Sequence, residues 1–406
     1  MSDVVVIGAG LAGLVAALRL AQGGARVTLL AKGIGGLPLS QGTIDVLGYA
    51  PDRVSDPLAA LDRLPADHPY TVLGADAVRQ GVEFLADSLG GALVGTPTRS
   101  VVLPTAVGAL RPTCLVPPSM LAGEISGATS YAIVGFQQLK DFFAPLCAAN
   151  LARQAAPGGG RIQARPVVLD LPAVDGWADS NATRYAKAFD DQAYRARFAT
   201  AVAPHLRDGE VVGVPAVLGL DDPGAHVHLE QALGHPVFEI PLPPPSVPGL
   251  RLNGLLTGLL RQARVRVVTG SHVVSYEASG GRITSVVADT AGRPRAYAAK
   301  AFVHAPGGLE SGAITMDSYG AVSERVFGLP LANAEGDLVS GATWTDQPLY
   351  RVGVSIDSRA HVSGPFDNLY AAGGIIAGAV RWSEKSGDGI AIASAVRAAD
   401  SILRGA

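Results

Sequence analysis

A glycine-rich turn near the first residue constrains the fold of this chain more than any other feature. Residues 3–7 (DVVVI) predict a short buried strand, residues 8–13 (GAGLAG) have GxGxxG spacing, and residues 11–23 predict a helix with an apolar face. A second apolar strand is expected at 26–31. A strand, a glycine turn, a helix and a strand within about 30 residues make a βαβ unit, so a parallel sheet is predicted.

The three glycines of this turn are typical of a phosphate site. Gly8 permits the tight turn, Gly10 lets the backbone approach a pyrophosphate, and Gly13 lets the helix pack closely on the strand. The helix N-terminus, with Leu11 and Ala12, then faces the negative charge. We therefore expect these five residues to bind a cofactor; a glycine turn without a ligand is the alternative.

Lys32 occupies the place where this motif usually has an acidic residue that binds the adenosine ribose. A lysine cannot accept hydrogen bonds from ribose hydroxyls, but it can pair with a phosphate. Two interpretations stay open. Either a dinucleotide is held in an altered way, or a mononucleotide places its single phosphate between the helix N-terminus and Lys32. A solvated Lys32 without a role is a third.

Composition and charge exclude several classes of protein. The 406 residues suggest two or three domains, and the net charge of −3 argues against nucleic-acid binding. The apolar stretch at 4–18 is too short to cross a membrane and lacks a basic flank, so we expect a cytoplasmic protein. Cys114 and Cys147 form no CxxC pair, so no iron–sulfur cluster is expected, and a disulfide is not expected in a reducing compartment.

The middle of the chain differs from both ends. Residues 96–248 are rich in proline and are interpreted as an inserted cap domain, whereas 1–95 plus 249–406 form the discontinuous cofactor-binding domain. The predicted fold class is α/β: a Rossmann-like FAD/NAD(P)-binding domain with an inserted cap domain.

Within the insert, a helix is expected at 137–153, bent near Pro145, and another at 183–206. Residues 240–249 (IPLPPPSVPG) predict a stiff polyproline connector. Residues 265–304 then alternate like a small antiparallel sheet with a tight turn at the Gly280–Gly281 pair.

Two later segments resemble parts of flavoproteins. Residues 302–308 (FVHAPGG) predict a buried strand that ends in a Pro-Gly-Gly turn. In flavoproteins with two dinucleotide-binding domains a similar strand and turn return the chain to the cofactor, and this resemblance implies Gly307 as a cofactor contact. Residues 368–396 (NLYAAGG…SEKSGDGIAIASAV) resemble the C-terminal flavin segment of the fumarate reductase and glycerol-3-phosphate dehydrogenase flavoproteins. In this resemblance a glycine turn ends a strand beside the flavin, and the last helix points its N-terminal N–H groups at the pyrimidine end of the ring, where negative charge grows on reduction. The residues implied are Gly373, Gly374, Gly387, Asp388, Gly389 and Ile390.

Most of the chain is similar to the B subunits of anaerobic glycerol-3-phosphate dehydrogenases. The similarity rests on VVVIGAGLAGL at the start, LSQGTIDVLG (39–48), HPYTVLG (68–74), IVGFQQLKDFFAPLCAANL (133–151) and NLYAAGG. It implies a flavoprotein with FMN as its usual cofactor, FAD being the alternative. It also implies two partners, the catalytic flavoprotein (A) and the iron–sulfur protein (C) of the same complex, and peripheral association with the inner face of the cell membrane through them. The implied reaction oxidises sn-glycerol 3-phosphate to dihydroxyacetone phosphate and passes electrons toward quinone.

Further site candidates come from single positions. The small polar residues Ser40, Gln41, Gly42 and Thr43 are typical of a loop along a flavin. Arg381 and Lys385 lie between the NLYAAGG turn and the last helix, where a cation could bind a phosphate or a reduced flavin; His304 is an acid–base candidate or a core histidine.

A metal site has weak support in the sequence. His226 and His228 could share one face of a strand, with His235 or Glu230 as a third ligand, but no metal is predicted.

Three functional alternatives remain at this level. The chain could oxidise the substrate or only relay electrons, and the lack of a clear acid–base pair favours a relay. It could instead be a structural protein of the complex with little or no flavin, or a self-sufficient FAD- or NADPH-linked oxidoreductase.

Overall fold

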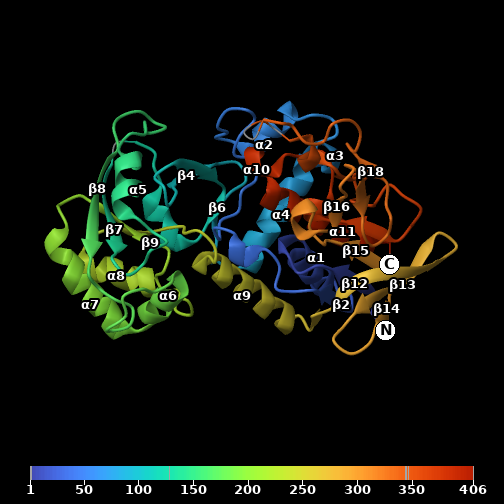
Figure 1. The fold of residues 1–406 in the computed structure, drawn as a ribbon, viewed down its shortest axis with the longest axis horizontal. Coiled ribbons are helices and arrows are strands. Elements are labelled where there is room, and N and C mark those ends of the chain that lie inside the picture. The colour runs from blue at the N-terminus through green and yellow to red at the C-terminus, as the bar shows by residue number, and fades with distance from the viewer. Residues whose placement is uncertain (1, 128, 343–344, 346, 406) are drawn as a thin grey trace.

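The computed structural model describes residues 2–127, 129–342, 345 and 347–405, and its centre is a five-stranded parallel sheet. The strand order is β11-β2-β1-β15-β20, and Val4 of the central strand lies in register with Val27 on one side and Ala301 on the other. Figure 1 labels β2 and β15 of this sheet. The strands are β1 (Val4–Ile7), β2 (Val27–Ala31), β11 (Arg266–Thr269), β15 (Ala301–His304) and β20 (Leu369–Ala371). The predicted α/β class with a Rossmann-like core is confirmed.

Helices cover one face of this sheet. Val4 and Val6 of β1 point into a core shared with these helices, and the last helix packs between the first helix and α4. The bounds are α1 (Leu11–Gln22), α4 (Ala75–Ser88), α9 (Val247–Gln262) and α11 (Gly387–Arg404).

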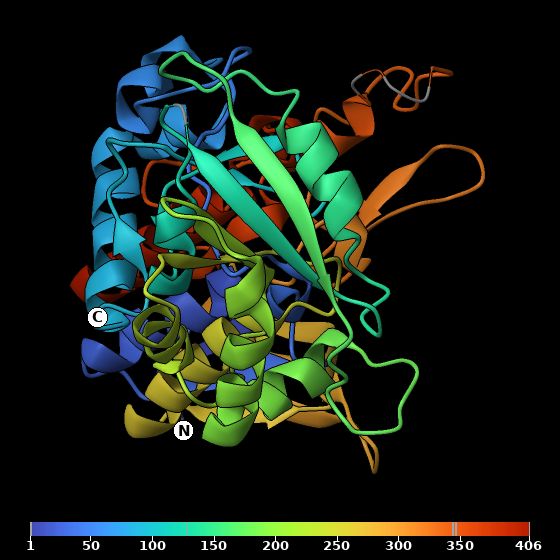
Figure 2. The ribbon, with the colours of Figure 1, turned by 90° about the vertical axis from the view of Figure 1, so that its left-hand side faces the viewer.

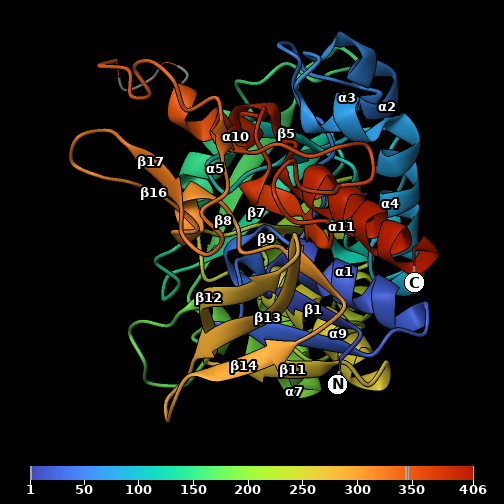
Figure 3. The same ribbon diagram turned by 90° about the vertical axis from the view of Figure 1, so that its right-hand side faces the viewer.

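An antiparallel meander covers the other face, so the sheet lies between two layers (Figure 3). Val5 and Ile7, the residues that alternate with Val4 and Val6, join its core with Ile283. Its strands are β12 (His272–Ser279), β13 (Arg282–Asp289) and β14 (Arg295–Ala298).

The expected antiparallel sheet at 265–304 is therefore wrong at both ends. β11 and β15 join the parallel sheet, and the middle three strands alone form the meander. Gly280 and Gly281 do form the turn, with φ of 58° and 75°. Alternation identifies a strand but not its hydrogen-bonding partner.

The middle of the chain contains a second parallel sheet (Figure 2), of order β10-β9-β7-β8. This sheet has its own hydrophobic cluster. That cluster runs from Val102 to Val247 and contains stacked aromatic rings such as Phe136 on Tyr185. The proposed division at 96–248 stays a prediction. The elements are β7 (Ser130–Phe136), β8 (Gln163–Leu169), β9 (Val211–Pro215), β10 (Val237–Ile240), α5 (Ala144–Leu151), α6 (Ala182–Asp190), α7 (Gln192–Val202) and α8 (Ala225–Leu233).

Helix boundaries differ from expectation where capping residues intervene. Pro145 lies in the first turn of α5 instead of bending a longer helix, because that position needs no N–H. The helix expected at 183–206 is two helices, since Asp191 ends α6 and its carboxylate accepts the Ala193 N–H to cap α7. Ser246 likewise caps α9, so the proline connector is shorter than predicted.

The remaining helices and strands are short and lie outside the two parallel sheets. The β4–β5 hairpin belongs to the proline-rich segment, whereas β6 pairs with β3. Their bounds are α2 (Pro57–Ala60), α3 (Pro69–Leu73), β3 (Val94–Gly95), β4 (Val101–Pro104), β5 (Leu110–Thr113), β6 (Leu115–Val116), β16 (Ile314–Met316), β17 (Val322–Glu324), β18 (Leu331–Ala332), β19 (Gly353–Val354) and α10 (Arg381–Glu384). Within the described ranges, no helix is both long and apolar enough to span a bilayer.

Candidate cofactor site

The turn after β1 is held by contacts that only glycine permits. Gly8 has φ of 106°, and a Cβ there would stand 2.1 Å from the carbonyl oxygen of Ala305. A Cβ on Gly13 would stand 1.9 Å from the carbonyl oxygen of Gly8. A Cβ on Gly10 would meet nothing within 4 Å. Gly8 and Gly13 therefore serve the packing of strand and helix, while Gly10 borders open space at the N-terminus of α1.

The turns after β15 and β20 meet the first turn at the carboxyl edge of the sheet. Gly373, with φ of 77°, lies over Ala12, and its N–H is donated to Ser394 Oγ at 3.0 Å. A Cβ on Gly374 would stand 3.2 Å from the backbone nitrogen of Gly308, which follows Gly307. The structure thus brings three predicted glycine segments together at the edge where open α/β sheets bind ligands.

The loop after β2 borders the same edge. A Cβ on Gly35 would stand 2.2 Å from the carbonyl oxygen of Ala9, so the loop crosses the first glycine turn. Lys32, at the start of this loop, is exposed. Further along, Gly42 packs on Pro248 at the start of α9, between the half-buried Gln41 and the buried Thr43; Ser40 is half-buried as well.

The loop that contains Ser40 to Thr43 continues onto the N-terminus of the last helix. Gly389 donates its N–H to the carbonyl oxygen of Asp45 at 2.9 Å, and Asp45 donates its own N–H to Asp388 Oδ2 at 3.2 Å. Gly387 opens α11, and Ile390 of its first turn is buried in the core. Two predicted segments about 340 residues apart are therefore directly hydrogen-bonded.

A charged cluster lies where these two segments meet. The guanidinium of Arg111, on β5, contacts the Asp45 carboxylate and the Gln41 side chain and lies 3.3 Å from Thr43 Oγ1. Lys385 has a left-handed backbone, with φ of 53°, and its Cβ lies 2.9 Å from the position of a Cβ on Gly48.

Burial dominates the electrostatics of this cluster. It raises the pKa of Asp45, although Arg111 opposes the rise. Burial and the nearby Asp45 raise the pKa of Asp388 to about 7. Burial, followed by repulsion from Arg111, lowers the pKa of Lys385. All three groups thus move toward their neutral forms.

Arg381 lies beside the second glycine pair. Its Nη2 is 3.1 Å from the position of a Cβ on Gly308, and it lies 3.4 Å from Glu310 Oε1. The Arg381 side chain is 16% exposed, whereas that of Glu310 is 62% exposed. The guanidinium is therefore placed at the mouth of the glycine turns, where it can bind an anion.

His304 is buried and hydrogen-bonded to Glu324 on the meander side of β15. Its Nε2 is 3.0 Å from Glu324 Oε1, and its ring packs edge-on against Phe327. Burial would raise the pKa of Glu324, but the hydrogen bond from His304 and the N–H groups of Val326 and Phe327 outweigh it, so the pKa is lowered. This arrangement makes His304 a structural anchor for the segment around 324–327 and does not bring it to Arg381 or Lys385.

The histidines considered as metal ligands are on a helix. His226 and His228 belong to α8, not to a strand, and residues two apart on a helix do not share a face. His228 Nε2 lies 3.3 Å from Gln192 Nε2. Among the residues that the structure describes, no group of three or more His, Cys, Asp or Glu side chains is arranged to hold a metal ion.

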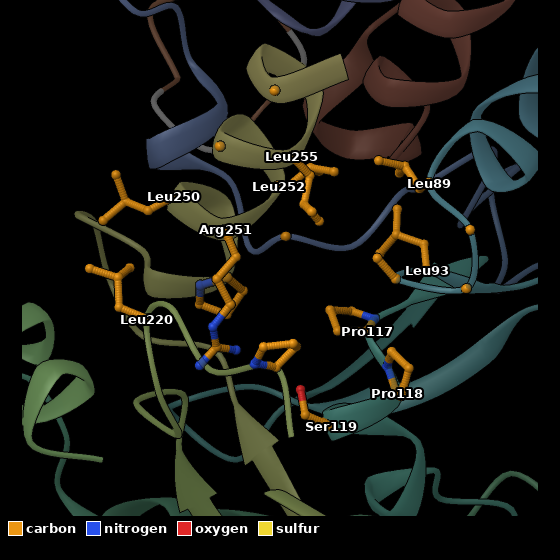
Figure 4. Close-up of a pocket in the computed structure, with 18 of the residues that line it drawn as sticks. Leu89, Leu93, Pro117, Pro118, Ser119, Leu220, Leu250, Arg251, Leu252 and Leu255 are labelled. Atoms are coloured by element: carbon orange, nitrogen blue, oxygen red, sulfur yellow. The ribbon is translucent and has the colours of Figure 1, made fainter. Parts of the chain in front are cut away.

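A cavity of about 920 Å³ lies away from the three glycine turns, between α9, the end of α4 and the loops that follow β6 and β9. Figure 4 shows its mainly apolar wall, with Leu252 and Leu255 of α9 on one side and Leu89 and Leu93 on another. Arg251 and Asp221 are its charged lining residues, and Arg251 is paired with Glu239 at 2.7 Å. Gly42 touches both this cavity and the loop described above.

Sequence reasoning missed Arg111, Asp45 and the pair His68–Glu384. His68 Nδ1 accepts the Tyr70 N–H, so its Nε2 carries the proton donated to Glu384 Oε2 at 3.1 Å. Asp45 and His68 lie inside motifs that the family resemblance identified. Nothing local distinguishes Arg111, because its partners lie 66 to 70 residues earlier.

Comparison with known proteins assigns the family. Residues 3–390 match the family described as FAD binding domain. The probable B subunit of an anaerobic glycerol-3-phosphate dehydrogenase from Halobacterium salinarum is 35% identical, with 97% of this chain and 96% of that protein covered. The B subunit of the anaerobic glycerol-3-phosphate dehydrogenase of Pectobacterium atrosepticum is 31% identical, with 99% and 98% covered. A flavocytochrome c3 fumarate reductase in its open conformation aligns with a TM-score of 0.47 and 13% identity, over 99% of this chain and 78% of that one.

The FAD description supports the expected flavin but gives no support to FMN. The family match is long and the relatives are covered almost end to end. The chain therefore belongs to the FAD binding domain family and, within it, to the B subunits of anaerobic glycerol-3-phosphate dehydrogenases.

Proposed function

We propose that this chain is the B subunit, a flavoprotein, of a quinone-linked anaerobic glycerol-3-phosphate dehydrogenase. In that role it takes part in oxidising sn-glycerol 3-phosphate to dihydroxyacetone phosphate and in passing the electrons on. The observation that carries the proposal is the meeting of three glycine turns at one sheet edge, with open space beside Gly10. The names of relatives that match over nearly their full length support glycerol 3-phosphate as the proposed substrate.

The proposed cofactor is FAD. Gly10 and the N-terminus of α1 offer the backbone approach that a pyrophosphate needs. The family match is to an FAD-binding domain, which favours a dinucleotide over a mononucleotide held by Lys32. We assign the pyrophosphate to Gly8, Gly10, Leu11, Ala12 and Gly13.

The flavin ring is assigned to the other glycine segments and the loop along them. A bound flavin accepts a hydride and can release electrons singly, while the protein supplies placement and electrostatics. The N–H groups at the start of α11 stabilise negative charge at its pyrimidine end, and Arg381 binds an anionic group of the substrate or the ring. The residues proposed to line the ring are Ser40, Gln41, Gly42, Thr43, Gly307, Gly373, Gly374, Gly387, Asp388, Gly389 and Ile390.

We propose that the chain works with two partners of the same complex, the catalytic flavoprotein (A) and the iron–sulfur protein (C). Those partners hold it at the inner face of the cell membrane and connect it to quinone. The names of the relatives, which describe them as subunits, support a multi-subunit assembly.

Chromatography of the cofactor released by acid from the purified chain tests the flavin assignment. Intact FAD is expected; FMN would overturn the choice of FAD, and the absence of any flavin would favour a structural role.

Dye reduction tests whether this chain oxidises the substrate by itself or only together with the partner proteins. We expect glycerol 3-phosphate to reduce a dye only after the partner proteins are added. Reduction by the isolated chain would place substrate oxidation here, and reduction by NADPH alone would indicate a self-sufficient oxidoreductase.

A further inference from the structure

The side chain of Arg381 lies across the mouth of the glycine turns. A Cβ on Gly387, the first residue of α11, would stand 3.6 Å from Arg381 Cβ and 3.8 Å from its Cδ. At the other end, Arg381 Nη2 lies 3.1 Å from the position of a Cβ on Gly308 and 3.6 Å from that of a Cβ on Gly374. The side chain therefore extends from the start of α11 to the turns that follow β15 and β20.

The backbone before Arg381 is held by one glutamate. Arg381 begins α10, whose four residues are too few to form a stable helix without outside contacts. Glu384 Oε1 accepts the N–H of Val380 at 2.9 Å, and the N–H of Glu384 is donated to the carbonyl oxygen of Val380 at 3.1 Å. Glu384 thus binds both backbone groups of the residue that precedes Arg381.

The carboxylate of Glu384 is itself fixed by buried donors. Its Oε2 accepts hydrogen bonds from His68 Nε2 at 3.1 Å and from Ser386 Oγ at 2.8 Å. His68 is 1% exposed, and Ser386 is fully buried. Burial would raise the pKa of Glu384, but the hydrogen bonds from His68, Val380 and Ser386 outweigh it, so the pKa is lowered and the carboxylate is ionised at neutral pH.

Two sequence motifs converge on Glu384. His68 begins HPYTVLG, and the loop LSQGTIDVLG ends at Gly48. The N–H groups of Gly48 and Tyr49 are donated to the carbonyl oxygen of Glu384 at 2.8 and 3.1 Å. Both motifs are therefore hydrogen-bonded to the residue that holds the backbone before Arg381.

We propose that Glu384, fixed by His68, is a positioning residue that directs the guanidinium of Arg381 across the mouth of the glycine turns. Without the carboxylate, the Val380 N–H loses its acceptor and α10 loses the contact that sets the direction of Arg381. The consequence for the reaction rests on the proposed function, in which Arg381 binds an anionic group at this place.

Phenylglyoxal labelling of the full chain tests the positioning without any need for activity. The reagent modifies accessible guanidinium groups, and mass spectrometry of peptides measures Arg381 separately. The Arg381 side chain is 16% exposed, so Glu384→Ala should raise its labelling rate several-fold. Labelling of Arg79, whose side chain is 49% exposed, should not change, and Glu83→Ala on the exposed face of α4 is the matched control. An unchanged rate at Arg381 in Glu384→Ala would overturn the proposal.

A milder substitution covers the case in which Glu384→Ala does not fold. Glu384→Gln keeps the size of the side chain and one acceptor oxygen, but its amide nitrogen cannot accept the hydrogen bonds of His68 and Ser386. We expect a smaller rise in the labelling of Arg381 in this variant. No rise at all would contradict the proposal.

A double-mutant cycle in the assembled complex tests the consequence. Glu384→Ala should lower kcat/KM for glycerol 3-phosphate, as Arg381→Ala does, but should cause little further loss in a chain that already carries Arg381→Ala. Equal losses in both backgrounds would show that Glu384 does not act through Arg381 and would overturn the proposal. Unchanged kinetics in Arg381→Ala, together with faster labelling in Glu384→Ala, would instead contradict the proposed function of Arg381 and support the positioning.

Discussion

Gly389 lies directly against Tyr70: a Cβ atom at position 389 would stand 2.1 Å from the phenol oxygen. That oxygen is 2.5 Å from the carbonyl oxygen of Val46 and 3.0 Å from that of Ser386, so it joins the loop that follows Thr43 to the start of α11. The HPYTVLG motif thus has a structural meaning, because Tyr70 and His68 both hold the segment 384–389 in place.

Tyr70→Phe should destabilise the protein by about 1–3 kcal/mol, because it leaves buried carbonyl oxygens without their donor. Thermal unfolding measures the effect, and FAD affinity should fall with it because both segments border the proposed ring. The control is Tyr319→Phe, since Tyr319 is 95% exposed and its hydroxyl should contribute nothing. Equal melting temperatures for the two variants would contradict this role of Tyr70.

In the first glycine turn, Gly13 serves the packing of strand and helix, whereas Gly10 is proposed to serve cofactor binding. Gly13→Ala should lower stability by about 1–3 kcal/mol or more, because the new Cβ would stand 1.9 Å from the carbonyl oxygen of Gly8. Gly10→Ala should change stability by at most about 1 kcal/mol, since open space surrounds that position. It should nevertheless weaken FAD binding, which titration of the flavin-free protein measures. Unchanged FAD affinity in a folded Gly10→Ala protein would remove the pyrophosphate from this turn.

Arg381→Ala should affect catalysis more than stability. Its contact with Glu310 is long and partly exposed, so the ion pair contributes little to folding. A charge-assisted hydrogen bond to an anion contributes about 1.5–3 kcal/mol, which corresponds to about a 10- to 100-fold loss of kcat/KM in the assembled complex. Arg79→Ala, on the exposed face of α4, is the matched control. Wild-type kinetics for Arg381→Ala would rule out a role in substrate or flavin binding.

The buried pair His304–Glu324 predicts a pH dependence in acid. Since the pKa of Glu324 is lowered from its ordinary value of 4.5, its ionised form stabilises the fold above that pH. This contribution should disappear as the pH falls through the folded pKa. Glu324→Gln should reduce stability near neutral pH by about 3–5 kcal/mol and flatten the acid dependence. Denaturation at several pH values checks this against the exposed Glu335→Gln. Parallel acid profiles for Glu324→Gln and wild type would contradict the assignment.

The parts of the fold that sequence predicts are local ones. The βαβ start follows from periodicity and three glycines within 31 residues, and the last helix, Gly387–Arg404, follows from the resemblance of residues 368–396. The capping side chains of Asp191 and Ser246 place the starts of α7 and α9 where the sequence analysis did not expect them. The hydrogen bond of each cap contributes more free energy than the weak helix propensity of the neighbouring residues.

The parts that sequence does not predict depend on distant partners. β11 and β15 have the same alternating pattern as the meander strands, and only three-dimensional packing assigns them to the parallel sheet. Arg111 belongs to the candidate site because its guanidinium contacts the carboxylate of Asp45, which lies on a different segment. Glycine segments predict the edge proposed for the cofactor, whereas the charged residues beside it, such as Arg111, have no local sequence signature.

The place of α11 has a consequence for the order of assembly during synthesis. This helix follows every other element in the described part of the chain, yet it packs between α1 and α4, and its first turn closes the edge at Asp45. Residues 1–95 therefore leave the ribosome long before their core is complete, whereas the second sheet has all its strands once residue 240 has emerged. The core around α1 and α4 is completed only when residue 404 has been made, so its apolar surface stays exposed longer than that of the second sheet.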